Sequence, residues 1–416
     1  MTNPSDDKLI TPGRSVGVLA ASGWAAVSTI IVTAVASRAL GKSDYTYFLV
    51  YWSVLFGCFQ ILTGLQNEAV RAVGEAAAGG SEPPSRQPAK VLVMALLLAA
   101  ALAVVVMCTA PLWMPRLAVG PVILVVCAVS VVAYGGHLTM SGILAGRHQW
   151  GTMAALNALE PTVRVILVVV AALLVPRLAT LQAAAAVSAL AWVLFALVVS
   201  TGRSATSARG DQPLNRLMAN AGWAMLAAAA SAVLVNGFPA IVSVALGKDT
   251  PGLAALLLGV QLTRAPLMMP LAAFQGVAIA GFVASRQGRL RALIKPFVAV
   301  LGLGVLLAGA AWLLGPWLMH MIWGEQYVLH GAVLGGLTFA AVSLALLTLT
   351  GTATIAIGEH RAFLVGWLVG AGAAVGLLFW VPAADAVRVI IAVMAGPLAG
   401  VIVHLLAIRA HERQAG

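Results

Sequence analysis

The sequence has few charged residues. Only 9% of its 416 residues are Asp, Glu, Lys or Arg, whereas 61% are hydrophobic, and the mean hydropathy is +1.00. In soluble domains about a quarter of the residues are charged. Apolar runs of roughly 20 residues, the length of a helix that crosses a bilayer, recur along the chain. The composition therefore excludes an ordinary soluble protein and predicts an all-α polytopic membrane protein.

Cysteine is scarce as well, and its positions show no pattern. Cys58, Cys108 and Cys127 all fall in apolar runs without paired spacing. Such an arrangement gives neither a disulfide framework nor a metal site, so we expect small packing residues. The chain also lacks a Walker motif or another phosphate-binding loop. We therefore expect no metal, no cofactor and no ATP hydrolysis by this chain.

Twelve apolar segments are long enough to cross a membrane. We place them at 15–37, 47–69, 91–113, 119–143, 150–175, 179–200, 217–245, 252–283, 296–319, 328–356, 362–382 and 384–408. No convincing cleavage site ends the first apolar run, so we expect it to be a retained span and not a removed signal peptide.

Basic residues are distributed unevenly over the loops. With the N-terminus inside, sixteen of the 24 Lys and Arg residues lie in cytoplasmic segments, six lie outside, and Arg164 and Arg264 fall within spans. Because cytoplasmic loops are enriched in Lys and Arg, we expect both termini in the cytoplasm. The expected location is a bacterial inner membrane. The net charge of +11 reflects this bias and suits anionic lipid head groups. We see no separate basic domain for nucleic acid.

The two halves of the sequence resemble each other. Two short motifs recur in order: Gly23-Trp24 with Gly222-Trp223, and Leu-Gly-Lys at 40–42 with the same triplet at 246–248. Their nearly constant offset predicts a duplication of six spans, with both copies in the same orientation. We expect a lobe at 1–200, a cytoplasmic linker at 201–216 and a second lobe at 217–416. The expected monomer is then a two-lobed bundle of twelve helices.

The fifth predicted span carries two opposite charges. Glu160 lies near the bilayer centre, Arg164 follows one helical turn later on the same face, and Pro161 lies between them. Pro161 cannot donate to the backbone carbonyl of Asn157, so we expect a kink and a freed carbonyl there. An unpaired charge at this depth costs at least about 3 kcal/mol, so both charges should face protein or water.

The eighth predicted span carries a second arginine. Arg264 lies at about mid-depth, Gln261 shares its helix face, and Pro266 and Pro270 follow. Neither intramembrane arginine is repeated in the other half of the sequence. We expect these prolines to make the helix irregular.

Two interpretations of these groups remain open. In the first, Glu160 forms a buried ion pair with Arg164 or Arg264 that only holds helices together. In the second, the arginines give a cavity a positive potential that attracts an anionic substrate, with Asn157 and Gln261 beside them. Glu160 then orients Arg164 or relays a proton. H⁺ or Na⁺ coupling stays an open expectation.

Other polar residues lie near the ends of spans. Asn67, Glu68 and Arg71 end the second span at the cytoplasmic face, where they form either an interfacial cluster or a substrate entrance. Three histidines lie near the ends of spans: His137, His320 and His404. This position favours an ordinary interfacial role for each of them over a role in coupling transport to an ion. The motifs GWLVG (366–370) and GPLAG (396–400) allow helices to approach closely, and we expect that packing within this chain.

Three stretches carry a resemblance to a known family. Leu40, Gly41, Asp44 and Tyr45 match a leucine-glycine pair followed by an acidic-tyrosine segment. The other two stretches are MSGILAGRHQWGTMAALNALEPTVRVILVVV and VQLTRAPLMMPLAAFQGVAIAGFVAS. Together they resemble polysaccharide flippases of the Wzx type, within the multidrug/oligosaccharidyl-lipid/polysaccharide exporter superfamily.

This resemblance implies a fold, a substrate and partners. It implies a V-shaped bundle with a cationic central cavity, to which Arg164 and Arg264 would contribute. The implied activity is movement of an isoprenoid-pyrophosphate-linked saccharide to the outer leaflet, beside membrane lipids and an envelope-polysaccharide polymerase or glycosyltransferases. A drug exporter coupled to cations is the alternative, although the first span lacks the acidic residue that many such relatives use.

Two further classes of protein compete with a transporter. A membrane glycosyltransferase needs acidic residues in a sizeable outer loop, and the short outer loops here hold only Asp44, Asp249, Glu325 and Asp385, scattered. We therefore expect a protein that is not an enzyme. A scaffold for envelope assembly that transports nothing stays open on sequence grounds.

Overall fold

A computed structural model describes residues 12–78, 88–247, 249–264, 267, 289–357 and 359–415. Helices make up all the regular structure in these ranges, apart from one isolated β-bridge between Lys90 and Arg209. The expected all-α fold class is therefore confirmed. By contacts, the chain divides into two compact units: unit 1 ends at Ala229, and unit 2 begins at Ala230.

Eleven of the described helical stretches, some made of two or three consecutive helices, are long and apolar enough to cross a membrane. In unit 1 the helices are α1 (Pro12–Ala39), α2 (Lys42–Ile61), α3 (Thr63–Ala78), α4 (Val91–Leu117), α5 (Pro121–Gly146), α6 (Trp150–Leu174), α7 (Leu178–Val187), η2 (Ser188–Leu190), α8 (Ala191–Val198), α9 (Ser200–Ala205) and most of α10 (Leu214–Ala232). In unit 2 they are η3 (Val233–Gly237), α11 (Phe238–Leu246), α12 (Leu253–Leu262), α14 (Arg289–Trp323), η4 (Glu325–Tyr327), α15 (Gly331–Ala356), α16 (His360–Trp380) and α17 (Asp385–Ala415).

These helices match the predicted spans closely, and they show a multi-pass membrane protein. The second span is longer than predicted, because helix continues from Lys42 to Ala77 with a break at Leu62. Only the first part of the eighth predicted span is described, as the short apolar helix α12. Most of its remainder, with Pro266 and Pro270, lies outside the described residues.

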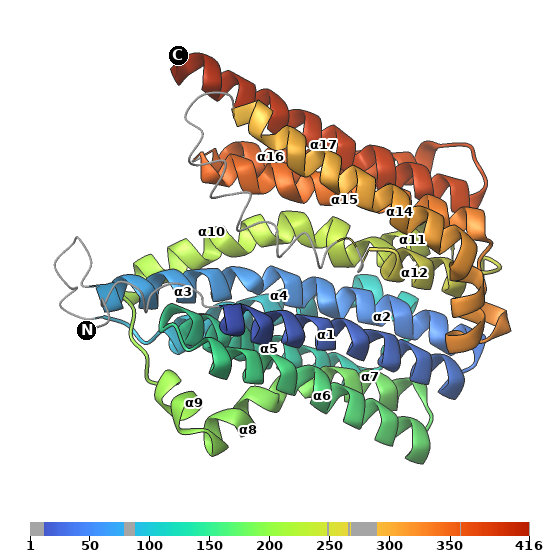
Figure 1. Cartoon of the computed structure of the whole chain (residues 1–416). Helices are drawn as coiled ribbons and strands as arrows, with labels where there is room; N and C mark the ends of the chain where they lie inside the picture. The colour runs from blue at the N-terminus through green and yellow to red at the C-terminus, as the bar shows by residue number, and fades with distance from the viewer. Residues whose placement is uncertain are drawn as a thin grey trace. The chain divides into compact units, whose positions relative to one another are not determined.

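Unit 1 is built around α5, which packs against α3 and α4, while α1 packs along α6 (Figure 1). Small residues on α5 permit this close approach. A Cβ atom on Gly135 would lie 2.6 Å from the Cβ of Ala99 on α4, and one on Gly142 would lie 2.9 Å from the Cβ of Ala69 on α3. Glycine at both positions therefore lets three helices share one core.

Unit 2 contains a bundle in which α17 packs along both α15 and α16, and α14 packs along α15 (Figure 1). The two small-residue motifs meet at the contact between α16 and α17. A Cβ on Gly370 would lie 3.4 Å from the carbonyl oxygen of Gly396, and one on Gly400 would meet the backbone of Gly366. The prediction that these motifs pack within the chain is confirmed.

The segment 201–216, predicted as a linker, is part of unit 1 and folds against its other residues. Its backbone pairs with residues 88–91: Gly210 donates to the carbonyl of Ala89 (3.0 Å), and Val91 donates to the carbonyl of Ala208 (3.1 Å). The boundary between the two units falls further along the chain, inside α10.

Candidate functional site

Glu160 and Arg164 form a buried ion pair on α6. The Nε atom of Arg164 donates to Oε1 of Glu160 (3.1 Å), and Nη2 donates to Oε2. Both residues are only 3% exposed. Helical spacing of four residues brings the two side chains onto one face, so the pairing is local. Of the two partners that the sequence left open for Glu160, the structure selects Arg164.

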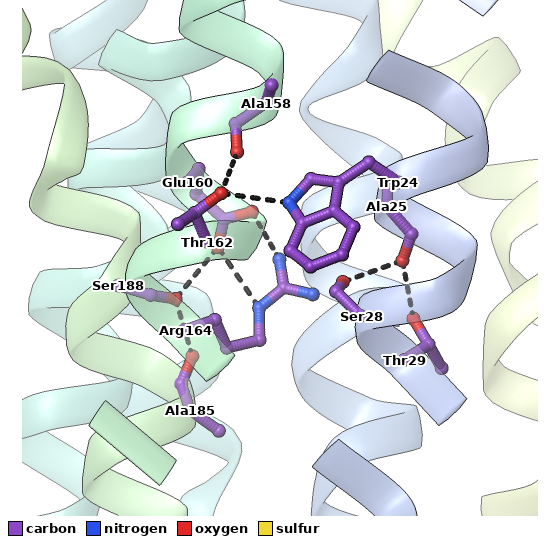
Figure 2. A network of polar contacts seen from close by, with 10 residues as sticks. All are labelled: Trp24, Ala25, Ser28, Thr29, Ala158, Glu160, Thr162, Arg164, Ala185 and Ser188. Atoms are coloured by element: carbon purple, nitrogen blue, oxygen red, sulfur yellow. Dashed lines mark hydrogen bonds and ion pairs between the residues drawn. The ribbon is translucent and has the colours of Figure 1, made fainter. Parts of the chain in front are cut away.

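Other elements of unit 1 complete this pair (Figure 2). The Ser188 hydroxyl in η2 lies 2.8 Å from Oε1 of Glu160 and also 2.9 Å from the carbonyl of Ala185. On α2, the rings of Phe56 and Trp52 lie 4.7 and 5.5 Å from the guanidinium carbon of Arg164. Aromatic faces attract a cation. The ion pair is thus held by three elements and shielded from water.

A second contact anchors α6 to α1. The indole Nε1 of Trp24 donates to the hydroxyl of Thr162 (2.8 Å), which donates to the carbonyl of Ala158 (2.7 Å), as Figure 2 shows. The matching tryptophan of the internal repeat, Trp223, is 70% exposed. Among the described residues, the repeated Gly-Trp motif therefore makes a partly buried polar contact in one copy, whereas the other copy is exposed.

Arg264 occupies a different environment in unit 2. Its Nη1 donates to the carbonyl oxygens of Leu234 (2.6 Å) and Val235 (3.1 Å), and its guanidinium carbon lies 5.5 Å from the Phe238 ring. The two carbonyls belong to η3, a π-helical turn between α10 and α11. Such turns widen the backbone spacing and release carbonyls from the regular helical pattern.

The positive charge of Arg264 has no carboxylate partner among the described residues. The residue is 7% exposed, and its buried Nε has no hydrogen-bond partner there. Gln261, three residues earlier, likewise has a buried Nε2 without a partner in the described ranges. All acidic residues of unit 2 lie in loops or at helix ends: Asp249, Glu325, Glu359, Asp385 and Glu412. Two unused N–H donors beside an unneutralised cation are suited to an anion.

The remaining predicted cavity residues are placed as follows. Asn157 is half-buried on α6, and Pro161 lies inside that helix, which continues without a break from Trp150 to Leu174. Glu160 and Arg164 lie in unit 1, whereas Gln261 and Arg264 lie in unit 2.

The predicted cytoplasmic group contains a charged cluster. Arg71 donates to both carboxylate oxygens of Glu68 (2.9 and 2.6 Å) and to both of Asp211 (2.8 and 3.2 Å). Asn220 lies 3.4 Å from Glu68, whereas Asn67 is exposed. Bidentate arginine pairs have a defined geometry. Arg71 therefore links α3 to the segment between α9 and α10.

Sequence reasoning missed several of these partners. Ser188 lies in an apolar span with no charged neighbour, and Asp211 lies in a stretch that looks like a solvated loop. The π-helical turn whose carbonyls accept from Arg264 could not be recognised from the types of residue that form it. The close spacing of Glu160 with Arg164 and of Glu68 with Arg71, in contrast, could be found from the sequence.

Comparison with solved structures defines the class of fold. A mutant of the Vibrio cholerae MATE transporter VcmN matches with a TM-score of 0.70 over 97% of this chain and 96% of that chain, at 14% identity. Inward- and outward-facing conformations of a multidrug resistance MATE family transporter of the MOP superfamily match with TM-scores of 0.69 and 0.68, at 14% and 16% identity. They cover 93% and 96% of this chain, and 95% of theirs in both cases. The chain has the MATE transporter fold.

Curated relatives then define the family. Uncharacterized protein Rv1510 of Mycobacterium tuberculosis is 36% identical over 400 residues, covering 94% of this chain and 90% of its own length. Uncharacterized protein Rv3630 of the same species is 33% identical over 416 residues, covering 95% and 94%. No protein-family model matches. The chain belongs to the family of these mycobacterial proteins.

Proposed function

We propose that this protein is a transporter that moves an isoprenoid-pyrophosphate-linked saccharide from the cytoplasmic to the outer leaflet by alternating access. The MATE fold supports transport, because solved proteins of this fold include inward- and outward-facing conformations. The substrate class rests on the sequence resemblance to Wzx-type flippases and on the chemistry around Arg264. On this proposal the protein is not an enzyme.

The environment of Arg264 carries the proposal. Among the described residues, the buried guanidinium of Arg264 donates to backbone carbonyls and has no carboxylate beside it. Burying such a charge without a counter-ion is costly, so the residue is expected to have a task. A pyrophosphate group would supply the missing negative charge and accept from the unused Nε of Arg264 and Nε2 of Gln261.

Arg164 has a different role in this proposal. Glu160 neutralises it within unit 1, so it offers less positive potential than Arg264 does. Attraction of an anion by Arg164 would require that Glu160 take up a proton or move away. Coupling to H⁺ through Glu160 is therefore a proposal that the same pair supports, and Na⁺ coupling is its alternative.

A multidrug exporter coupled to cations is the second candidate. The structural neighbours named as multidrug transporters favour it. Against it, the first span from Gly17 to Ala39 contains no acidic residue, and no acidic residue of unit 2 lies mid-span. A cationic drug would meet the free charge of Arg264 and would be repelled by it.

The orientation and the partners belong to the same proposal. Both termini would lie in the cytoplasm, which places the Arg71 cluster at the cytoplasmic face and makes Asn67, Glu68 and Arg71 candidates for the substrate entrance. The expected partners are membrane lipids and an envelope-polysaccharide polymerase or glycosyltransferases, with the transporter itself a monomer.

The test is a flipping assay in proteoliposomes. Purified protein is reconstituted with a fluorescent polyprenyl-pyrophosphate-linked saccharide, and an impermeant reagent quenches the lipid that has reached the outer leaflet. Arg264→Ala should abolish flipping, whereas Arg361→Ala, the same change at an exposed arginine of unit 2, should flip like the parent.

Three outcomes separate the alternatives. If Arg264→Ala flips like the parent, Arg264 does not bind the substrate anion. If the parent instead extrudes a cationic dye along an H⁺ or Na⁺ gradient and flips no lipid, the multidrug function replaces the proposed one. If the parent moves neither substrate, the scaffold interpretation is favoured.

A further inference from the structure

Unit 2 contains a buried histidine that the proposed function does not use. His404 lies on α17 and is 0% exposed. The sequence favoured an ordinary interfacial role for it, because it lies near the end of its span. The structure instead places its ring where α15, α16 and α17 meet.

Both ring nitrogens of His404 contact other helices. Nδ1 lies 2.9 Å from the hydroxyl oxygen of Thr350 on α15, and Nε2 lies 3.2 Å from the carbonyl oxygen of Phe363 on α16. A side chain on Gly366 would overlap the imidazole, so glycine at that position provides the space for the ring. The site is therefore shaped around the histidine by two neighbouring helices.

Counting hydrogens shows that this ring can hold either one proton or two. A carbonyl oxygen only accepts, so Nε2 must carry hydrogen to bond Phe363. In the neutral ring Nδ1 then accepts from the hydroxyl of Thr350. The same hydroxyl lies 2.9 Å from the carbonyl oxygen of Leu346, which is a second acceptor for its single hydrogen.

A second proton can be added without moving any heavy atom. When Nδ1 is protonated, it donates to the Thr350 oxygen, and the hydroxyl hydrogen rotates to the carbonyl of Leu346. Each nitrogen therefore keeps a hydrogen-bond partner in both charge states. A buried nitrogen left without a partner in either state would cost about 1–3 kcal/mol, and the arrangement around His404 avoids this cost in both.

Two further titratable side chains, His411 and Glu359, pair with each other at one end of the contact between α16 and α17. Nδ1 of His411 lies 3.3 Å from Oε1 of Glu359, and their side chains are 29% and 41% exposed. His411 follows His404 by seven residues on one face of α17, and Glu359 precedes Phe363 by four residues at α16. The two contacts are successive layers between α16 and α17, separated by roughly 10 Å at 1.5 Å per residue.

No carboxylate lies beside His404 among the described residues. Helix α15 has no ionisable residue, and α16 has only His360, whose side chain is not described, and Arg361, which is exposed. On α17 the nearest charged residue is the exposed Arg409. From α14, which also contacts α17, Leu293 and Phe297 pack against Leu405 and Ile408, whereas Lys295 is exposed.

We propose that His404 is a proton-binding site of unit 2, reached past the Glu359–His411 pair, and that its protonation loosens the junction of α15, α16 and α17. The proton comes from water at that end of the bundle and adds to the lone pair of Nδ1. It leaves a positive charge in an apolar junction without a counter-ion, and such a charge favours hydration and looser packing. The proposal does not depend on which substrate is transported.

The direct test is nitrogen NMR of the full chain in lipid nanodiscs with ¹⁵N-labelled histidine. The sequence has seven histidines, and the His404 signals are those lost in His404→Gln. As the pH falls, these signals should change from a neutral ring with hydrogen on Nε2 to an imidazolium. Thr350→Val should move this transition to lower pH by about one unit, because the imidazolium loses its hydrogen-bond acceptor.

Amide hydrogen exchange gives an independent readout. Acidification should increase exchange in residues 363–370 and 400–408 of the parent but not of His404→Gln. His320→Gln, an exposed histidine on α14, is the matched control and should behave like the parent. Glu359→Gln should slow the response to a pH jump without changing its end point.

Each outcome decides a part of the proposal. If the His404 signals stay neutral down to the lowest pH at which the protein remains folded, the proton site is excluded. If acid-induced exchange persists in His404→Gln, protonation elsewhere causes it. If Glu359→Gln responds as fast as the parent, the access route is wrong. Should His404→Gln fail to fold, Thr350→Val both assigns and tests the site: one histidine transition should move to lower pH while those of the other six histidines stay unchanged, and the absence of any such shift would exclude the site.

Discussion

The guanidinium of Arg164 is held by the carboxylate of Glu160, whereas that of Arg264 donates, within the described ranges, to backbone carbonyls such as that of Leu234. Both arginines are buried, yet in the part of the chain that the structure describes only Arg164 has a carboxylate partner. This difference separates two roles. A paired arginine can brace a helix, whereas a cation without a carboxylate is better suited to a ligand that brings its own negative charge.

The first prediction concerns the Glu160–Arg164 pair. Glu160→Ala leaves a buried guanidinium without its carboxylate, and we expect a loss of about 3–5 kcal/mol in the free energy of unfolding. Replacing both residues, as in Glu160→Leu with Arg164→Met, should recover most of that loss, because neither charge then remains buried. Thermal or denaturant unfolding in detergent measures both changes.

The double variant also separates the two interpretations of this pair. If it is stable and flips lipid like the parent, the pair is a structural brace. If it is stable but flips nothing, the charges take part in the transport cycle. If the double variant is as unstable as Glu160→Ala, the unpaired charge does not cause the loss of stability. The altered packing of the side chains at this position then explains it.

The second prediction is that removing the charge of Arg264 raises stability but abolishes transport activity. Methionine has a similar length and no charge, so Arg264→Met should stabilise the protein by about 1 kcal/mol or more while abolishing transport of an anionic lipid. Unfolding and flipping are measured on the same preparation. The matched change at Arg164 should destabilise, because it leaves Glu160 unpaired. A clear loss of stability in Arg264→Met would instead make Arg264 a structural residue that braces η3.

The span pattern could be predicted from the sequence, because a membrane restricts a long apolar run to one solution, a helix that satisfies its own backbone. The Glu160–Arg164 pair could also be predicted, because residues four apart lie one turn apart on the same face of a helix. Ser188, by contrast, reaches Glu160 from 28 residues away, and no local pattern encodes that contact. The π-helical carbonyls around Arg264 were equally hidden, because a widened turn keeps an apolar composition.

The third prediction concerns the segment that folds against unit 1. Asp211→Asn removes the charge that Arg71 holds in that segment and leaves the pair with Glu68. Because the Arg71 side chain is 35% exposed, we expect the segment to lose only about 1 kcal/mol of local stability. This loss should appear as a roughly fivefold rise in the rate of amide exchange in residues 206–213. The control is Arg209→Ala, which removes a single bond to the carbonyl of Pro88. An equal rise in that control would show that the backbone pairing, not Arg71, fixes the segment.

The fourth prediction compares two glycines on α16. A Cβ on Gly366 would overlap the His404 ring, so Gly366→Ala should cost about 1–3 kcal/mol through overpacking. A Cβ on Gly372 of the same helix would meet no atom within 4 Å, so Gly372→Ala should be neutral or stabilise by up to about 1 kcal/mol. Melting temperatures in one detergent compare the pair. Equal melting temperatures would mean that the His404 junction accommodates the extra carbon by moving.

The last prediction uses the internal repeat as its own control. Trp24→Phe removes the hydrogen bond from the indole to Thr162 while keeping an aromatic ring, and we expect a loss of about 1 kcal/mol. Trp223→Phe makes the same change at the matching position of the repeat, where the side chain is 70% exposed, and should leave the free energy of unfolding unchanged. Chemical unfolding of both variants and of Thr162→Val measures the difference. Trp24→Phe and Thr162→Val together should cost little more than either change alone, because both remove the same bond. Additive losses would show that Trp24 stabilises the contact between α1 and α6 by packing instead.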